Sequence, residues 1–272
     1  VEYIRVILCE LNRIASHLIF YGSFAGDVGM TTPFLYGFRD WERIMMLFEA
    51  VSGSRMMPNY FRVGGVKQDL PADFRERMGG LIPRLRQGIE ECDDLLTHNE
   101  ILLGRTRGVG TISAARALDF GLSGPNLRAA GVAQDLRRSQ PYCVYERFQF
   151  DIPVGKNGDS WDRYWVRMEE MRQSLRIVEQ ALEGLPEGPV MADVPRALRP
   201  PQGEVYVSTE NPRGELGVYL VSRGQDKPYR LKIRAPSFCN LMALGELMRD
   251  CYIADCVAII GSLDIVLGEV DR

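Results

Sequence analysis

The sequence predicts an α+β fold that is mainly helical and carries a small antiparallel sheet. Apolar residues recur at helical spacing through most of residues 1–185, whereas residues 203–234 alternate between apolar and polar side chains. A proline-rich connection at 186–202 separates the two patterns. We therefore expect a helical core at 1–185 and, at 203–272, a small sheet followed by a C-terminal helix and a tail.

Long helical stretches make up the predicted core. The first runs from residue 1 to about residue 26. The second starts at Thr32-Pro33, because proline is favoured in the first turn of a helix, and stops before Gly53. A third spans 71–99, where Pro83 is expected to kink or divide it. The stretch 159–185 has the broadest apolar stripe and gives the clearest helical pattern in the chain.

The remaining segments are shorter. Residues 58–66 predict a short strand and a loop, and glycine-rich stretches at 104–112 and 121–131 predict loops around a short helix capped by Ser113. Residues 149–154 alternate like a strand. Alternation with intervening turns predicts a three-stranded sheet with strands at 204–208, 216–222 and 229–234. A helix at 240–261 and a tail are expected to complete the chain.

Composition excludes several function classes. The net charge is only −3, with both signs mixed along the chain, so we expect no nucleic-acid surface. No apolar run approaches the roughly 20 residues that cross a bilayer, so membrane association must come through partners.

The six cysteines form no CxxC pair and the two histidines, His17 and His98, are isolated; we expect reduced thiols and no bound metal. Because the helical pattern at Val1 has no cap before it, we expect residues to precede it.

One face of the first helix carries a candidate site. Ile19, Ser23 and Asp27 are spaced i, i+4 and i+8, so an apolar residue, a hydroxyl and a carboxylate lie in line. Gly22 and Gly26 beside them leave room for another backbone or a flat ligand. The alternative is that Asp27 only ends the helix and the glycines serve helix packing.

A second candidate cluster lies near the C-terminus. Asp264 follows the apolar run 258–263, so we expect a carboxylate in an interior cleft, with Arg62 or Arg272 as its partner. Arg213, beside Gly214 in a predicted turn, is a further candidate contact, although such charges equally suit a solvated turn. The sequence contains no clear dinucleotide-binding motif, no P-loop and no GxSxG motif.

Several motifs resemble one known family, in the same order along nearly the whole chain. They include residues 2–18, DVG at 27–29, TPF at 32–34, RVGGV at 62–66, PRGE at 212–215, YRLKIRAP at 229–236, GSLD at 261–264 and GEVDR at 268–272. On these motifs the chain resembles the quinone-reducing core subunit, the D-type subunit, of respiratory NADH:quinone oxidoreductase (complex I). That family is related to the large subunits of nickel–iron hydrogenases, so the resemblance implies the hydrogenase large-subunit fold.

The resemblance also implies a function. Hydrogenases hold nickel and iron with two CxxC pairs; the C-terminal pair is missing here, which argues against a nickel site, and the family uses the vacated cavity for quinone. The chain itself would bind no cofactor, and electrons would come from the iron–sulfur cluster of a small B-type partner protein. A C-type protein and membrane-arm subunits are the other implied partners. They would hold the chain at the cytoplasmic (or matrix-equivalent) side of a membrane, in a complex that translocates protons.

Specific residues carry over from the family. Asp27 matches the aspartate that pairs with a quinone-binding histidine, and that histidine and a quinone-binding tyrosine would precede Val1. The positions that match residues lining or supporting the pocket are Ile19, Ser23, Phe34, Leu35, Arg62, Arg213, Asp264, Val266 and Arg272.

The chain departs from the family in two places. The family usually has histidine where Met57 precedes Pro58-Asn59, and it commonly has a further helical segment at the 194–203 junction, which is either deleted here or a loop absent from this sequence. Two alternatives stay open: the large subunit of a related membrane-bound hydrogenase, and a structural subunit that has lost catalysis. The resemblance identifies neither the electron donor nor the quinone.

Overall fold

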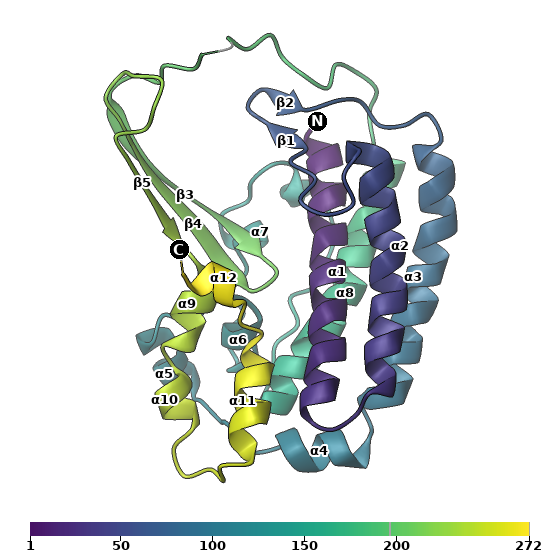
Figure 1. The fold of residues 1–272 in the computed structure, drawn as a ribbon, viewed down its shortest axis with the longest axis vertical. Helices are drawn as coiled ribbons and strands as arrows, with labels where there is room; N and C mark the ends of the chain where they lie inside the picture. Colours follow the sequence, from purple (N-terminus) through teal and green to yellow (C-terminus); the bar gives the residue numbers. More distant parts are fainter. Residues whose placement is uncertain (196, 272) are drawn as a thin grey trace.

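A computed structural model describes residues 1–195 and 197–271. Four long helices lie side by side as a bundle (Figure 1): α1 (Glu2–Asp27), α2 (Thr32–Ser52), α3 (Phe74–Leu96) and α8 (Ser160–Glu183). Helix α1 packs against α2 and α8, and α3 packs against the same two helices. The long helices predicted from the sequence are confirmed. Gly53 ends α2 in the left-handed conformation (φ 77°), as a glycine at this position allows.

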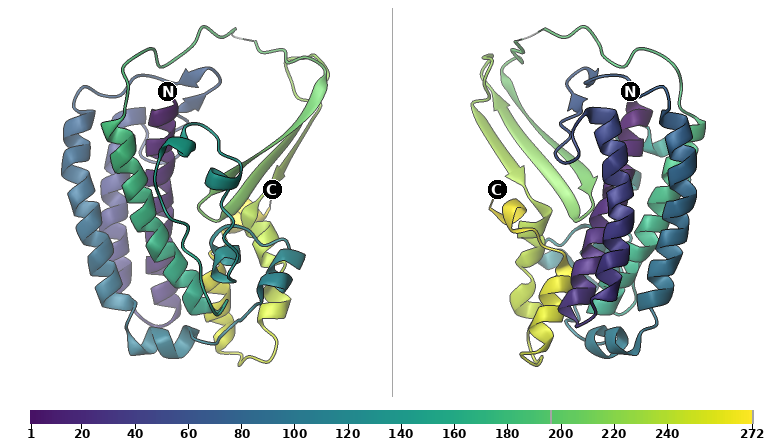
Figure 2. Two further views of the ribbon diagram at one scale, coloured as in Figure 1. Left: turned by 180° about the vertical axis from the view of Figure 1, so that it is seen from behind. Right: turned by 45° about the vertical axis from the view of Figure 1, so that its right-hand side comes forward.

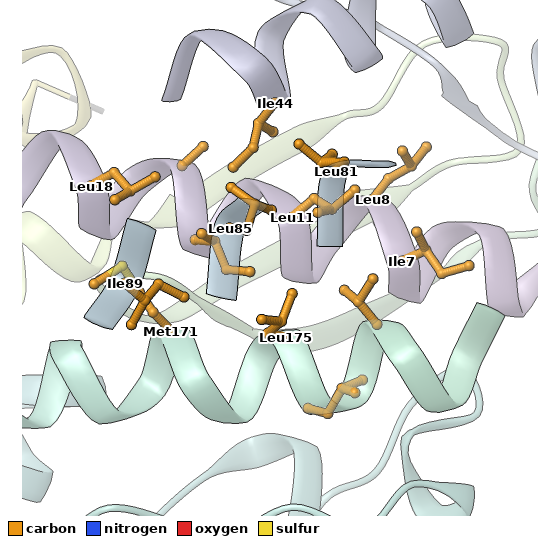
Figure 3. Close-up of a cluster of buried hydrophobic side chains, with 14 of the residues drawn as sticks. Ile7, Leu8, Leu11, Leu18, Ile44, Leu81, Leu85, Ile89, Met171 and Leu175 are labelled. Carbon is orange, nitrogen blue, oxygen red and sulfur yellow. The ribbon is translucent and has the colours of Figure 1, made fainter. Parts of the chain in front are cut away.

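The main core fills the space between these helices. Figure 3 shows Leu11 and Leu18 of α1 beside Leu85 of α3 and Leu175 of α8. These side chains are almost completely buried, and each contributes roughly 1.5–3 kcal/mol on transfer from water. Pro83 does not divide α3 as expected; it lies on the exposed face, and the helix continues through it.

The predicted three-stranded antiparallel sheet is also confirmed. Its strands pair in the order β3-β4-β5: β3 (Gly203–Asn211), β4 (Gly214–Ser222) and β5 (Arg230–Arg234). Asn211 pairs with Gly214, so Pro212-Arg213 forms a two-residue turn between β3 and β4. A separate small hairpin joins β1 (Phe61–Arg62) to β2 (Gly65–Val66).

Short helices build the rest of the C-terminal part and the loops. They are α4 (Glu100–Thr106), α5 (Ala114–Asp119), α6 (Gly124–Ala129), α7 (Leu136–Ser139), the 3-10 turn η1 (Tyr145–Arg147), α9 (Pro236–Leu241), α10 (Leu244–Leu247), α11 (Asp255–Leu263) and α12 (Leu267–Val270). A smaller apolar cluster lies among α5, α6, α10 and α11.

Three predictions about these segments were wrong. The supposed loop at 121–131 contains α6, and the loop at 104–112 overlaps the end of α4. The single helix at 240–261 is instead a run of separate helices, with Asp250 in the left-handed conformation between α10 and α11. The supposed strand at 149–154 joins no sheet in the described chain. Its Gln149 and Asp151 N–H groups instead donate to the side chains of Gln180 and Gln173 of α8.

Residues 186–195 leave α8 and pass over the end of the bundle at which α1 begins, and residues 197–202 lead into the sheet (Figures 1 and 2). Val66 N donates to Val190 O at 3.0 Å, and Ala192 N donates to Gly64 O at 3.0 Å, so this connection pairs with the β1–β2 hairpin. The division of the chain into two parts at this connection stays a prediction.

Candidate functional site

A cavity of about 760 Å³ lies between the bundle and the C-terminal part. Its wall is mostly apolar and comes from α1, α2, the loop after α2, the sheet and the segment around α12. The wall includes Ser16, Ile19, Trp41, Met45, Phe48, Met57, Arg213, Leu216, Ile233, Val266 and Glu269. Three predicted site residues, Ile19, Arg213 and Val266, therefore meet in one cavity although they come from distant parts of the sequence.

Arg213 and Asp264 form a pair at this wall. The two-residue turn between β3 and β4 presents Arg213, and Asn240 Nδ2 fixes the turn by donating to Arg213 O at 2.9 Å. Arg213 Nε donates to Asp264 O at 3.0 Å, and Nη2 donates to Asp264 Oδ1 at 3.3 Å. Asp264 caps α11 in the left-handed conformation (φ 57°), uncommon for a residue with a side chain. Of the two predicted partners, Arg62 was wrong, because within the described residues Arg213 binds Asp264. The other predicted partner, Arg272, lies outside the described residues.

A second cation, Arg167 of α8, lies behind Asp264. Its Nε is 3.8 Å from Asp264 Oδ2, too far for a hydrogen bond. Its Nη atoms donate to the carbonyls of Ser262 and Leu263 at 2.9 and 3.2 Å, and its guanidinium stacks on Phe20, 4.3 Å from the ring centre. Arg167 thus anchors the end of α11 to α8.

A layer of buried charged side chains lies between the bundle and the C-terminal part. Glu10 of α1 accepts hydrogen bonds from Arg13, Arg137, Tyr145 and Ser174. Burial raises the pKa of Glu10, but Arg137 and Arg13 outweigh it and lower that pKa to about 2. Glu10 is therefore a carboxylate held within a complete set of donors.

Glu170 of α8 is the second centre of this layer. It lies 3.0 Å from His17 Nε2 and accepts from Arg128 Nε at 2.8 Å. Although burial alone would raise the pKa of Glu170, Arg128 and His17 hold it well below its usual range. Burial lowers the pKa of His17, so the ring is neutral, and Nε2 is the donor because an ionised carboxylate only accepts. His17 thus has a partner at Nε2, whereas its buried Nδ1 has no hydrogen-bond partner within the described residues.

Asp27 lies at the exposed C-terminal end of α1. Its carboxylate rests against Gly261 of α11, and within the described chain it accepts no hydrogen bond. Burial by these neighbours raises the pKa of Asp27. Helix α2 also comes close here, because a Cβ on Gly22 would lie 3.1 Å from Phe34 Cα. Gly22 thus admits a backbone, as predicted, whereas Gly26 faces open space.

The other predicted residues are dispersed. Ser23, Phe34 and Leu35 lie exposed near Asp27 at the α1–α2 corner, outside the wall of the cavity. Arg62 lies at the opposite end of α1, where its carbonyl accepts from Arg5 Nη2 at 2.8 Å. At 1.5 Å per residue, the 22 residues from Arg5 to Asp27 separate these ends by roughly 33 Å. Arg272 falls outside the described residues.

Two further properties concern metals and membranes. Between residues 1 and 271, with residue 196 left aside, no group of three or more His, Cys, Asp or Glu side chains is placed to hold a metal ion. The described helices include none long and apolar enough to span a bilayer.

Comparison with known proteins decides the family. The family model described as "Respiratory-chain NADH dehydrogenase, 49 Kd subunit" matches residues 27–200 and 194–272. The chain belongs to this family. It is 52% identical over 270 residues to the D-type subunit of NADH-quinone oxidoreductase from Desulforamulus reducens, covering 99% of this chain and 74% of the relative. The corresponding proteins of Dehalococcoides mccartyi strain 195 and Bacillus mycoides are 52% and 49% identical, covering 100% and 99% of this chain and 74% of each relative.

Membership in this family confirms the resemblance found in the sequence and makes the chain a subunit of an oxidoreductase. The sequence analysis missed this buried layer, in which Glu10 and Arg13 of α1 are both buried. A signal existed, because Glu10, Arg13 and His17 recur at i, i+3 and i+7, as an inward-facing polar stripe would.

Proposed function

We propose that this chain contributes the quinone-reduction site of an NADH-quinone oxidoreductase, with quinone in the cavity lined by Ile19, Arg213 and Val266. The observation that carries the proposal is this cavity, about 760 Å³ in volume, within the range of about 300–1,000 Å³ for pockets that bury a small molecule. Its apolar wall suits a flat ring, and Arg213 and Ser16 supply polar atoms that suit the quinone oxygens.

Quinone reduction adds two electrons and two protons and yields a quinol. We propose that the electrons come from the iron–sulfur cluster of a small partner protein, since the family resemblance assigns this chain no redox group of its own. Asp27, whose pKa is raised by burial, would orient the family's histidine and keep a proton available for the reduced ring. The Arg213–Asp264 pair would hold a cationic donor at the cavity wall, fixed in direction by two hydrogen bonds.

The same proposal includes partners and location. Exposed apolar side chains at the α1–α2 corner and after α2, among them Leu35 and Met57 at 68% and 87% exposure, suit burial against neighbouring subunits. We propose the small B-type iron–sulfur protein, a C-type protein and membrane-arm subunits as these neighbours. They would hold the chain at the cytoplasmic side of the membrane and couple quinone reduction to proton translocation.

Filling the cavity tests the proposal. Val266→Trp places a large ring in the wall and should raise the KM for quinone or abolish turnover in the assembled complex. NADH oxidation with an artificial acceptor that bypasses the quinone site should continue. Val205→Trp, the same change on an exposed strand position, is the matched control. Unchanged quinone kinetics in Val266→Trp would contradict the proposal and favour a structural role without catalysis.

A further inference from the structure

The start of the segment 261–264 touches Asp27. A Cβ placed on Gly261 would lie 2.7 Å from Asp27 Oδ2 and 3.0 Å from Phe24 Cδ2, closer than side chains ordinarily allow. Gly261 therefore lets α11 approach α1 at the point where the Asp27 carboxylate lies. The end of the same segment is Asp264, which binds Arg213 at the cavity wall. This short segment thus contacts the carboxylate of Asp27 and carries the carboxylate of Asp264.

Helix α8 fixes this segment in place. Arg167 donates to the carbonyls of Ser262 and Leu263, and Arg163 Nε donates to Ser262 Oγ at 2.8 Å. Both arginines are fully buried, so the segment is attached to the interior of the protein. A change at Gly261 must therefore be absorbed by its neighbours on α1, because the segment itself is not free to retreat.

We propose that Gly261 is a positioning residue for Asp27: because it has no side chain, it leaves the carboxylate room for the orientation used in quinone reduction. The inference rests on the proposed function of Asp27. Comparison with Gly37 separates this role from ordinary packing: a Cβ on Gly37 would lie 2.7 Å from the backbone oxygen of Leu18, which cannot rotate away. The atom nearest to Gly261 is instead the end of a side chain that can turn, so an added methyl group displaces the Asp27 carboxylate and leaves the fold intact.

Gly261→Ala in the assembled complex tests this role. A carboxylate displaced by about 1 Å lowers quinone turnover roughly tenfold or more, whereas NADH oxidation with the artificial acceptor is retained. The methyl group also removes water from the carboxylate, so the pKa of Asp27 rises further and the pH profile of quinone reduction shifts to higher pH. Gly79→Ala is the matched control, because Gly79 is an exposed helical glycine with open space around its Cβ position.

A double variant separates this inference from the proposed function. If Gly261 acts through Asp27, Gly261→Ala adds no further loss to Asp27→Asn, because the two effects are not additive. A further loss, or wild-type turnover in Gly261→Ala beside an impaired Asp27→Asn, overturns the inference and leaves the proposed function standing. Wild-type turnover in Asp27→Asn removes the proposed role of Asp27, and the inference with it.

Assembly of the variant gives a further check. If Gly261→Ala lowers the yield of assembled complex, Asp27→Ala in the same chain should restore it by removing the clashing carboxylate. Failure to restore the yield would show that the contact with Phe24 is the decisive one, and would overturn the inference.

Discussion

Glu170 Oε2 lies 3.0 Å from His17 Nε2, and both side chains are fully buried between α8 and α1. Arg128 of α6 binds the other oxygen of Glu170 and also reaches Glu210 of β3 at 2.9 Å. The pair therefore belongs to a charged layer that joins the helical bundle to the sheet. The stability of such a layer depends on every member, because removing one partner leaves a buried charge unpaired.

Glu170→Gln should destabilise the subunit strongly. The change leaves Arg128 without its closest counter-charge, and breaking a buried ion pair in this way costs about 3–5 kcal/mol. The midpoint of thermal unfolding of the subunit within the complex should fall. Glu90→Gln, which removes an exposed partner of Arg172, is the control and should change stability by less than about 1 kcal/mol. Equal effects of the two changes would contradict the importance of the layer.

Glu10 predicts a pH dependence of stability. Its pKa is about 2 in the folded chain against an ordinary 4.5, so the ionised carboxylate stabilises the fold above about pH 4.5. This contribution decreases as the pH falls from 4.5 towards 2. The stability difference between wild type and Glu10→Gln should therefore be constant near neutral pH and shrink below about pH 4.5. A pH-independent difference over that range would show that Glu10 is not ionised in the fold.

The purified subunit, free of partners, should contain no stoichiometric iron, nickel or zinc. The six cysteines include no CxxC pair, and the two histidines are isolated in sequence. Elemental analysis of the chain checks this prediction. A metal present at one equivalent per chain would overturn it and would favour the hydrogenase alternative.

The isolated chain should self-associate. The apolar run 44–48 contributes little to this, because in it only Met46 is exposed and the other side chains are buried. The exposed apolar surface lies instead at positions such as Leu35 and Met57. Sedimentation of the chain without partners should show aggregates or oligomers, and a stable monomer would contradict this prediction.

The sequence predicted the long helices and the sheet because their apolar residues follow a clear period. It failed where contacts distant in sequence decide the structure. Residues 149–154 alternate like a strand, yet the N–H groups of Gln149 and Asp151 donate to side chains of α8, which no local pattern could show. Pro83 was expected to kink or divide its helix, but it lies on the exposed face and α3 continues through it.

Individual residues of the candidate site could be predicted from the sequence, but their arrangement in space could not. Family resemblance named Arg213 and Asp264, whereas their pairing depends on the β3–β4 turn meeting the end of α11. Arg62 was proposed for the same pocket, yet it lies at the opposite end of α1 from Asp27. Gly261 had no side chain to attract attention, and its contact with Asp27 depends on the approach of two helices.

The proposed role of Asp27 in quinone reduction is tested by Asp27→Asn in the assembled enzyme. The change keeps the shape of the side chain and removes the charge-assisted hydrogen bond proposed with the family's histidine, worth roughly 1.5–3 kcal/mol. If this stabilisation is felt mainly in the transition state, quinone turnover of the assembled enzyme falls about tenfold to a hundredfold. NADH oxidation with an artificial acceptor stays unchanged. Wild-type quinone turnover in Asp27→Asn would contradict the account and leave Asp27 as a residue that only ends α1.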